Sequence, residues 1–168
     1  ILFLQGGATL QFSMVPLNLL TEGRTADYIM TGTWADKAVK EARRVGSVHE
    51  TGSTADTNFN RIPTDAELAF TPGAAYVHMT SNNTIFGTQW HHLPDVPEGV
   101  PLVNDASSDI FCRPVDIQRY GMIYGGAQKN LSIAGLTLVV VREDLLGKAP
   151  ASTPVYLNYA THAKERSL

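Results

Sequence analysis

The sequence predicts an α/β fold built on an open, mainly parallel sheet, and three observations support this prediction. Apolar runs of strand length alternate along the chain with helical patterns, which is typical of such sheets. Several of these runs are continuous and not alternating, as expected for strands that are covered on both faces. The length of 168 residues is enough for one domain that buries a real core.

Strands are expected wherever an apolar run of suitable length occurs. These runs cover residues 1–5, 27–32, 45–49, 74–80, 100–105, 122–126 and 135–141. The eight residues 127–134 separate the last two runs. A parallel connection needs about a dozen residues or more, so these two strands should be antiparallel. Residues 52–60 are rich in Ser, Thr, Asn and Asp without periodicity, which predicts a loop.

Two helices are expected between the strands. Ala8–Leu20 is apolar nearly all round and should be buried, and Pro16 inside it should kink or interrupt it. Trp34–Val45 has alanine and valine at i, i+3, i+4 and i+7 and charged residues opposite. This pattern predicts an amphipathic surface helix, with Gly46 as its C-terminal stop.

Composition excludes several classes of partner. The net charge is −3, and the Lys and Arg residues are scattered, which argues against nucleic acid or a membrane surface as a partner. The single cysteine, Cys112, rules out an internal disulfide and fits a reducing, cytoplasmic location. Its apolar surroundings, IFC, predict a buried structural thiol. The adjacent His91 and His92 lack metal-ligand spacing, so no metal site is expected.

The ends of the chain are unusual for a complete protein. ILFLQ opens inside an expected strand without an initiator Met, and THAKERSL stops without a terminating turn. The opening run also lacks the basic flank and cleavage site of a signal peptide. We therefore expect a fragment or the ordered part of a longer protein.

Two residues carry the strongest chemical signal. Asp105 ends the apolar run VPLVND, and Lys129 follows the run GMIYGGAQK, so both should reach the same edge of the sheet. A pyridoxal-phosphate enzyme needs such a pair, because the lysine forms a Schiff base with the cofactor and the aspartate keeps the pyridine nitrogen protonated. The alternative is a solvated loop lysine and an aspartate that caps a turn.

The segment FLQGGATLQF reads as strand, two glycines and helix. Glycines let the backbone approach an anion, and the free N–H groups of the first helical turn point at it. Many such turns bind nothing. A dinucleotide-binding module is the rival function, but the segment lacks the G-x-G-x-x-G spacing and no strand ends in an acidic residue about twenty residues later.

Four segments of the chain, in order, resemble the phosphoserine aminotransferases, a branch of the fold-type-I pyridoxal-phosphate enzymes. The segments are FLQGGATLQFSMVPLNLL, ADYIMTGTWADKAVKEA, YVHMTSNNTIFGTQW and SSDIFCRPVDIQRYGMIYGGAQKNLSIAGLTLVVVREDLLGKA. The resemblance runs from Ile1 to about His162. It implies the three-layer large domain of the aspartate-aminotransferase-like fold, with one antiparallel strand in the sheet. Residues 1–168 would then form an incomplete cofactor-binding domain, truncated at both ends.

The resemblance also implies a role for each candidate residue. Lys129 would be the Schiff-base lysine and Asp105 the partner of the pyridine nitrogen, with a lowered pKa. The other cofactor contacts would be the phosphate cup of Gly7, Ala8 and Thr9, the ring-stacking Trp34, Thr84 at the phenolic oxygen, and Gln128 at the phosphate. Several family members carry an arginine at the position of Thr9, and others a small hydroxyl residue. Asp109 and Asp116 are expected to be unimportant, with mild amide variants.

The function that the resemblance implies is transamination between glutamate and 3-phosphohydroxypyruvate, which gives O-phosphoserine and 2-oxoglutarate in serine biosynthesis. A related phosphorylated substrate belongs to vitamin B6 biosynthesis. The enzyme would be a cytoplasmic homodimer with a shared active site. The alternatives are a catalytically silent fragment and another class V aminotransferase with a different keto acid. The chain alone should be inactive, because the family's site needs an upstream His-Arg contact, a partner-subunit Asn-Thr loop and a C-terminal arginine.

Overall fold

The computed structural model describes residues 1–167 and is organised around one sheet of seven strands in the order β1-β9-β8-β7-β4-β2-β3. The strands are β1 Leu2–Gln5, β2 Thr25–Met30, β3 Ser47–Ser53, β4 Val77–Thr80, β7 Leu102–Asp105, β8 Met122–Gly126 and β9 Leu136–Val141. β9 is antiparallel to β1 and to β8, and every other neighbouring pair is parallel. The predicted sheet, with its single antiparallel strand, is confirmed.

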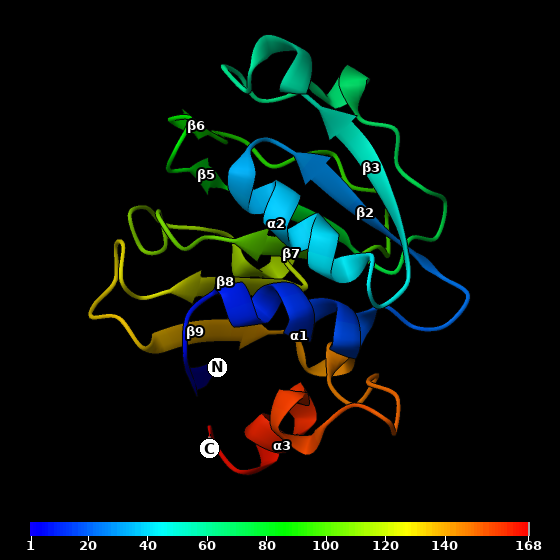
Figure 1. Ribbon diagram of the computed structural model, residues 1–168, viewed down its shortest axis with the longest axis vertical. Helices are drawn as coiled ribbons and strands as arrows, with labels where there is room; N and C mark the ends of the chain where they lie inside the picture. The colour runs from blue at the N-terminus through cyan, green and yellow to red at the C-terminus, as the bar shows by residue number, and fades with distance from the viewer. Residues whose placement is uncertain (168) are drawn as a thin grey trace.

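The helices lie on one face of this sheet. They are α1 Thr9–Leu19, α2 Thr33–Ala42 and α3 Tyr159–Lys164. Figure 1 shows α1 and α2 over the sheet, and Phe12, Ala38 and Tyr159 bring all three helices into one core cluster. The alternation of strand and helix along β1, α1, β2, α2 and β3 produces this arrangement, because each helix returns the chain to start the next parallel strand.

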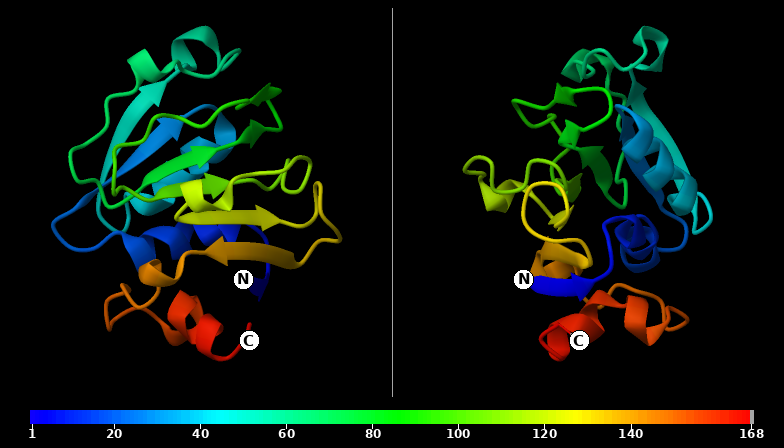
Figure 2. Two further views of the ribbon diagram at one scale, coloured as in Figure 1. Left: turned by 180° about the vertical axis from the view of Figure 1, so that it is seen from behind. Right: turned by 60° about the vertical axis from the view of Figure 1, so that its left-hand side comes forward.

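Loops and short 3-10 helices cover the other face, as the view from behind in Figure 2 shows. A second core cluster lies there, which includes Ile29, Met79, Trp90 and Ile123. The short helices are Ala55–Thr57, Asp65–Glu67, Ile117–Arg119, Glu143–Leu145 and Val155–Leu157. The last two lie on the side of the long helices, because Leu145 lies in the first core cluster and Leu157 packs against it. None of the described helices has the length and apolar character needed to cross a membrane.

Two details of the helix predictions need correction. Pro16 does not interrupt α1, which continues to Leu19. The proline removes one backbone donor, but burial of Val15 and Leu19 on either side of it holds both turns against the core. α2 ends at Ala42, earlier than predicted, and Gly46 follows as a turn residue whose N–H donates to the Ala42 carbonyl over 3.0 Å.

The predicted loop at residues 52–60 begins later than expected, because β3 continues through Ser53. Gly52 pairs with Ile29 of β2 after a register shift. An added Cβ on Gly52 would lie 2.6 Å from Leu68 Cδ2, so only glycine lets the following chain pack this closely on the strand. β3 is an edge strand, which explains why its polar sequence was read as a loop.

A small hairpin that the sequence analysis does not predict lies on the carboxyl side of β4. It consists of β5 Asn82–Asn83 and β6 Thr88–Gln89, which pair antiparallel. Strands of two residues are too short to show a period of two, so no pattern reveals them.

The prediction of a buried Cys112 is wrong, because the thiol is exposed. Ile110 is buried, but the next residue, Phe111, has a φ of 63° and is 71% exposed. The apolar run therefore turns away from the core after Ile110 and does not continue into it.

Candidate active site

All the candidate residues lie at one edge of the sheet. β1, β2, β4, β7 and β8 run in the same direction, so their carboxyl ends meet at this edge. Each candidate residue ends one of these strands or follows it: Gly7, Ala8 and Thr9 follow β1, Trp34 follows β2, Thr84 follows β4, Asp105 ends β7, and Gln128 and Lys129 follow β8. Ligands of open parallel sheets bind at this edge.

Lys129 is directed toward two other candidates. Its Nζ donates to Thr84 Oγ1 over 2.8 Å and lies 4.3 Å from the centre of the Trp34 ring. Residues from three separate strand ends therefore converge on one amine. Partial burial lowers the pKa of Lys129, and the Asp105 carboxylate opposes this shift. A second amine, Lys37 Nζ, lies 4.6 Å from the same Trp34 ring.

Asp105 is buried at the end of β7 with one oxygen held in place. Its Oδ1 accepts from the backbone N–H and from the hydroxyl of Ser107, over 3.0 and 2.6 Å. Among residues 1–167, no donor bonds its Oδ2. Burial raises the pKa of Asp105, while Ser107 and Lys129 lower it. The net effect is a raised pKa, whereas the sequence analysis predicts a lowered one. That prediction assumes a cationic pyridinium ring next to the carboxylate.

Ser107 is a site residue that sequence reasoning missed. Its hydroxyl also accepts from the backbone N–H of Gly126 over 3.0 Å, so it joins the end of β7 to the end of β8. The available signal was the order Asp-Ala-Ser, because an Asp side chain often bonds the backbone two residues later and a Ser hydroxyl at that position can donate a second bond.

The start of α1 is suited to an anion. Its N-cap residue Ala8 makes no side-chain capping bond, and the first turn contains no acidic residue. The Leu10 and Gln11 N–H groups donate to the Gly7 and Ala8 carbonyls over 3.0 and 2.9 Å, so the N–H groups of Ala8 and Thr9 are the ones available to an anion. Of the two preceding glycines, Gly6 adopts the positive φ of 94° that the turn requires, and an added Cβ on Gly7 would meet nothing within 4 Å.

Gly126 lets the start of α1 and the side chain of Gln128 both approach the end of β8 closely. An added Cβ there would lie 2.7 Å from Gln128 Oε1 and 3.1 Å from the backbone nitrogen of Ala8. Two candidate phosphate contacts that are far apart in the sequence thus meet over one glycine. The amine of Lys129, the buried carboxylate of Asp105, the ring of Trp34 and the N–H groups at the start of α1 are the chemical groups that pyridoxal phosphate needs.

The structure gives no support to a metal or a dinucleotide at this edge. Within residues 1–167, no group of three or more His, Cys, Asp or Glu side chains could hold a metal ion. β2, the strand after α1, ends at Met30 and so offers no acidic side chain to a ribose.

Comparison with known proteins gives the family. Residues 1–161 match the class V aminotransferases. The chain belongs to this family. It is 52% identical over 168 residues to the phosphoserine aminotransferase of Herpetosiphon aurantiacus. The match includes 100% of this chain and 46% of that protein. The chain therefore spans about half the length of the curated relatives that it matches.

Solved structures of this family have the same fold. The phosphoserine aminotransferase of Bacillus circulans subsp. alkalophilus superposes with a TM-score of 0.95 at 48% identity, over 99% of this chain and 46% of that one. The pyridoxal-phosphate-bound phosphoserine aminotransferase of Trichomonas vaginalis superposes with a TM-score of 0.92 at 34% identity, over 99% of this chain and 47% of that one. The predicted family and fold are confirmed, whereas the roles of the individual side chains remain predictions.

Proposed function

We propose that the protein is a pyridoxal-phosphate-dependent transaminase that converts glutamate and 3-phosphohydroxypyruvate into 2-oxoglutarate and O-phosphoserine. The observation that carries the proposal is the position of Lys129 Nζ, 2.8 Å from Thr84 Oγ1 and beside the Trp34 ring, at the sheet edge where Asp105 is buried. The choice of substrate is supported by relatives at 52% and 53% identity that are named phosphoserine aminotransferase.

Pyridoxal phosphate, when bound, supplies an aldehyde that bonds amines and a ring that takes up electrons from the substrate's α-carbon. Lys129 Nζ is the amine that holds this aldehyde in the resting enzyme. Once free of the aldehyde, this amine would serve as the base that carries the proton at the substrate's α-carbon. Its pKa is lowered by partial burial, which increases the neutral fraction that can accept a proton.

Asp105 keeps the ring nitrogen protonated. Ser107 holds Oδ1 with two hydrogen bonds, so Oδ2 would be the oxygen available to the ring nitrogen. The N–H groups at Ala8 and Thr9 and the side chain of Gln128 bind the phosphate beside Gly126. Trp34 stacks on the ring and shields it from water.

The decisive test of this assignment is chemical labelling of the lysine. The full-length protein is loaded with pyridoxal phosphate, reduced with borohydride and digested, and the pyridoxyl group is located by mass spectrometry. We expect the label on Lys129. Lys37 is the sharpest internal control, because it is the other amine near the Trp34 ring. A label on Lys37, on any other lysine or on none contradicts the proposal.

Substrate preference is tested by single half-reactions. O-phosphoserine should convert the bound cofactor to its amine form, whereas serine should do so poorly. Conversion by an unphosphorylated amino acid but not by O-phosphoserine would favour another class V aminotransferase. Comparison with the phosphorylated substrate of vitamin B6 biosynthesis would show whether the protein serves both pathways.

The resemblance to the family supports two further parts of the proposal, a cytoplasmic location and a homodimer whose partner completes each site. The dimer is tested by sedimentation of the full-length protein with and without cofactor. A strictly monomeric protein with full activity would contradict it.

A further inference from the structure

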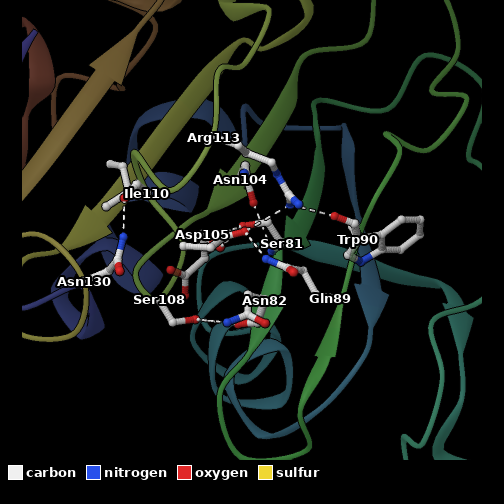
Figure 3. Close-up of polar contacts among 11 residues, drawn as sticks. Ser81, Asn82, Gln89, Trp90, Asn104, Asp105, Ser108, Ile110, Arg113 and Asn130 are labelled. Atoms are coloured by element: carbon white, nitrogen blue, oxygen red, sulfur yellow. Dashed lines mark hydrogen bonds and ion pairs between the residues drawn. The ribbon is translucent and has the colours of Figure 1, made fainter.

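Asp109 lies buried one turn after Asp105. That turn is rigid, because the Asp109 and Ile110 N–H groups both donate to the Ala106 carbonyl, over 3.1 and 2.8 Å. The Asp109 carboxylate bonds Ser81, Gln89 and Arg113, and Figure 3 shows these three partners close together. Its Oδ1 accepts from the Ser81 hydroxyl over 2.6 Å.

The second oxygen of Asp109 has two further donors. Oδ2 accepts from Gln89 Nε2 over 3.3 Å and from Arg113 Nη2 over 3.4 Å. The same Arg113 nitrogen donates to the Trp90 carbonyl over 2.8 Å. One buried carboxylate thus binds three side chains, and through Arg113 it is linked to the Trp90 carbonyl.

The contacts with Ser81 and Gln89 both lie at the open end of the hairpin, where Asn82 pairs with Gln89. Ser81 immediately precedes β5, and Gln89 ends β6. A two-stranded hairpin by itself is only marginally stable, so its position depends on such external contacts. A second link lies beside the first, since the Ser108 hydroxyl donates to the Asn82 carbonyl over 2.9 Å and accepts from Asn82 Nδ2 over 3.0 Å.

The turn of the hairpin carries Thr84, the residue that accepts from Lys129 Nζ. The hairpin also packs against the start of α2, because Asn83 Nδ2 donates to Thr31 Oγ1 over 3.0 Å. An added Cβ on Gly32 would lie 2.9 Å from Phe86 Cδ2, so the fit leaves little free space. A shift of the hairpin therefore moves Thr84 relative to both Lys129 and Trp34.

We propose that Asp109 is a positioning residue that fixes the hairpin, and through it Thr84, relative to Lys129 and Asp105. This inference rests on the proposed function only for the roles of Thr84 and Lys129. It replaces the expectation that Asp109 is unimportant. Asp116 does remain a suitable control, because it is exposed and its Oδ1 caps only the 3-10 helix Ile117–Arg119.

The first experiment measures the hairpin directly, without cofactor. Backbone hydrogen exchange of the full-length, cofactor-free protein is followed by mass spectrometry in Asp109→Asn and Asp116→Asn. Asparagine keeps the shape of aspartate but turns an N–H₂ group toward the donors of Gln89 or Arg113. We expect exchange in residues 82–89 to rise about tenfold in Asp109→Asn, on the scale of a hydrogen bond to a charged group. Exchange in helix α2 should not change in Asp109→Asn, and exchange in residues 82–89 should not change in Asp116→Asn.

The second experiment uses the visible absorption band of the bound cofactor, which reports contacts near Lys129. The pH midpoint of this band should move in Asp109→Asn in the same direction as in Thr84→Ala. A general loss of stability would not reproduce the effect of removing one hydroxyl. If Asp109→Asn fails to fold, Ser81→Ala takes its place, because it removes only the shortest of the three contacts.

The outcomes separate the two proposals. Unchanged exchange in residues 82–89, or a wild-type absorption midpoint when Thr84→Ala is shifted, overturns the role of Asp109. Borohydride labelling of a lysine other than Lys129 would overturn the proposed function, yet the exchange experiment would still decide whether Asp109 holds the hairpin.

Discussion

At the scale of single residues, Asp105 and Lys129 stabilise each other's charge in a site that disfavours both charges. Burial raises the pKa of Asp105 and lowers the pKa of Lys129, so each group is driven toward its neutral form. Each charge opposes the shift of the other. A cationic ring beside Asp105 would lower its pKa, as the charge of Lys129 does. The lowered pKa that the sequence analysis predicts therefore applies to the protein with cofactor bound.

The Asp105→Asn variant should retain the cofactor but lose turnover by several orders of magnitude, since the ring then no longer takes up electrons effectively. We expect the barrier to rise by about 4–7 kcal/mol, at about 1.4 kcal/mol per tenfold change in rate. The measurement is kcat with O-phosphoserine and 2-oxoglutarate, and Asp116→Asn is the matched control. Near-normal turnover in Asp105→Asn would refute the role of the carboxylate.

The same variant should have the opposite effect on the stability of the cofactor-free protein. Because folding raises the pKa of Asp105, its favourable contribution is complete below the unfolded value of 3.8 and is lost as the pH rises through the folded value. Asparagine mimics the neutral form and still accepts from Ser107. Asp105→Asn should therefore melt at a higher temperature than wild type at pH 7, and the gap should close toward pH 4. A lower melting temperature at pH 7 contradicts this.

At the scale of elements, the two adjacent glycines of β8 serve different faces of the sheet. An added Cβ on Gly126 meets Gln128 and the start of α1, whereas one on Gly125 would lie 3.1 Å from Ile110 Cδ1 in the opposite core. Successive residues of a strand point to opposite faces, so one substitution reaches the candidate phosphate site and the other does not.

Gly126→Ala should weaken cofactor binding roughly tenfold, the effect of one hydrogen bond to a charged group, because the methyl group displaces Gln128 or the Ala8 backbone. Gly125→Ala is the matched control, and it should lower the melting temperature with little change in cofactor affinity. Quenching of tryptophan fluorescence by added cofactor gives both dissociation constants. Equal constants for the two variants would show that Gly126 does not shape a phosphate site.

At the scale of the whole molecule, the described residues place helices on one face of the sheet and loops on the other, and the chain spans 46% of the relative from Herpetosiphon aurantiacus. The edge strand β1 also exposes Ile1 and Phe3, which favours self-association. The resemblance to the family predicts that further groups that position the substrate belong to the part of such relatives that this chain does not cover.

We expect the isolated 168-residue chain to bind cofactor weakly and to give no measurable conversion of O-phosphoserine and 2-oxoglutarate. Holding reactants in line contributes up to about 7–11 kcal/mol, so the loss of positioning groups is enough to abolish a measurable rate. The test compares the purified chain with the full-length protein. Comparable rates would overturn this prediction.

The sequence by itself determined the sheet, its one antiparallel strand and the arrival of Asp105 and Lys129 at a common edge. These features follow from local quantities, the length of apolar runs and of the loop between β8 and β9, which a single chain displays directly.

Only the tertiary structure decided the surroundings of those residues. The hairpin β5–β6 has strands too short to show a period, and the contact of Asp109 with Ser81 joins positions 28 residues apart. The close approach of Ala8 and Gln128 to Gly126 likewise depends on how α1 and the loop after β8 pack. Such contacts depend on the packing of separate elements, and no local pattern in the chain records them.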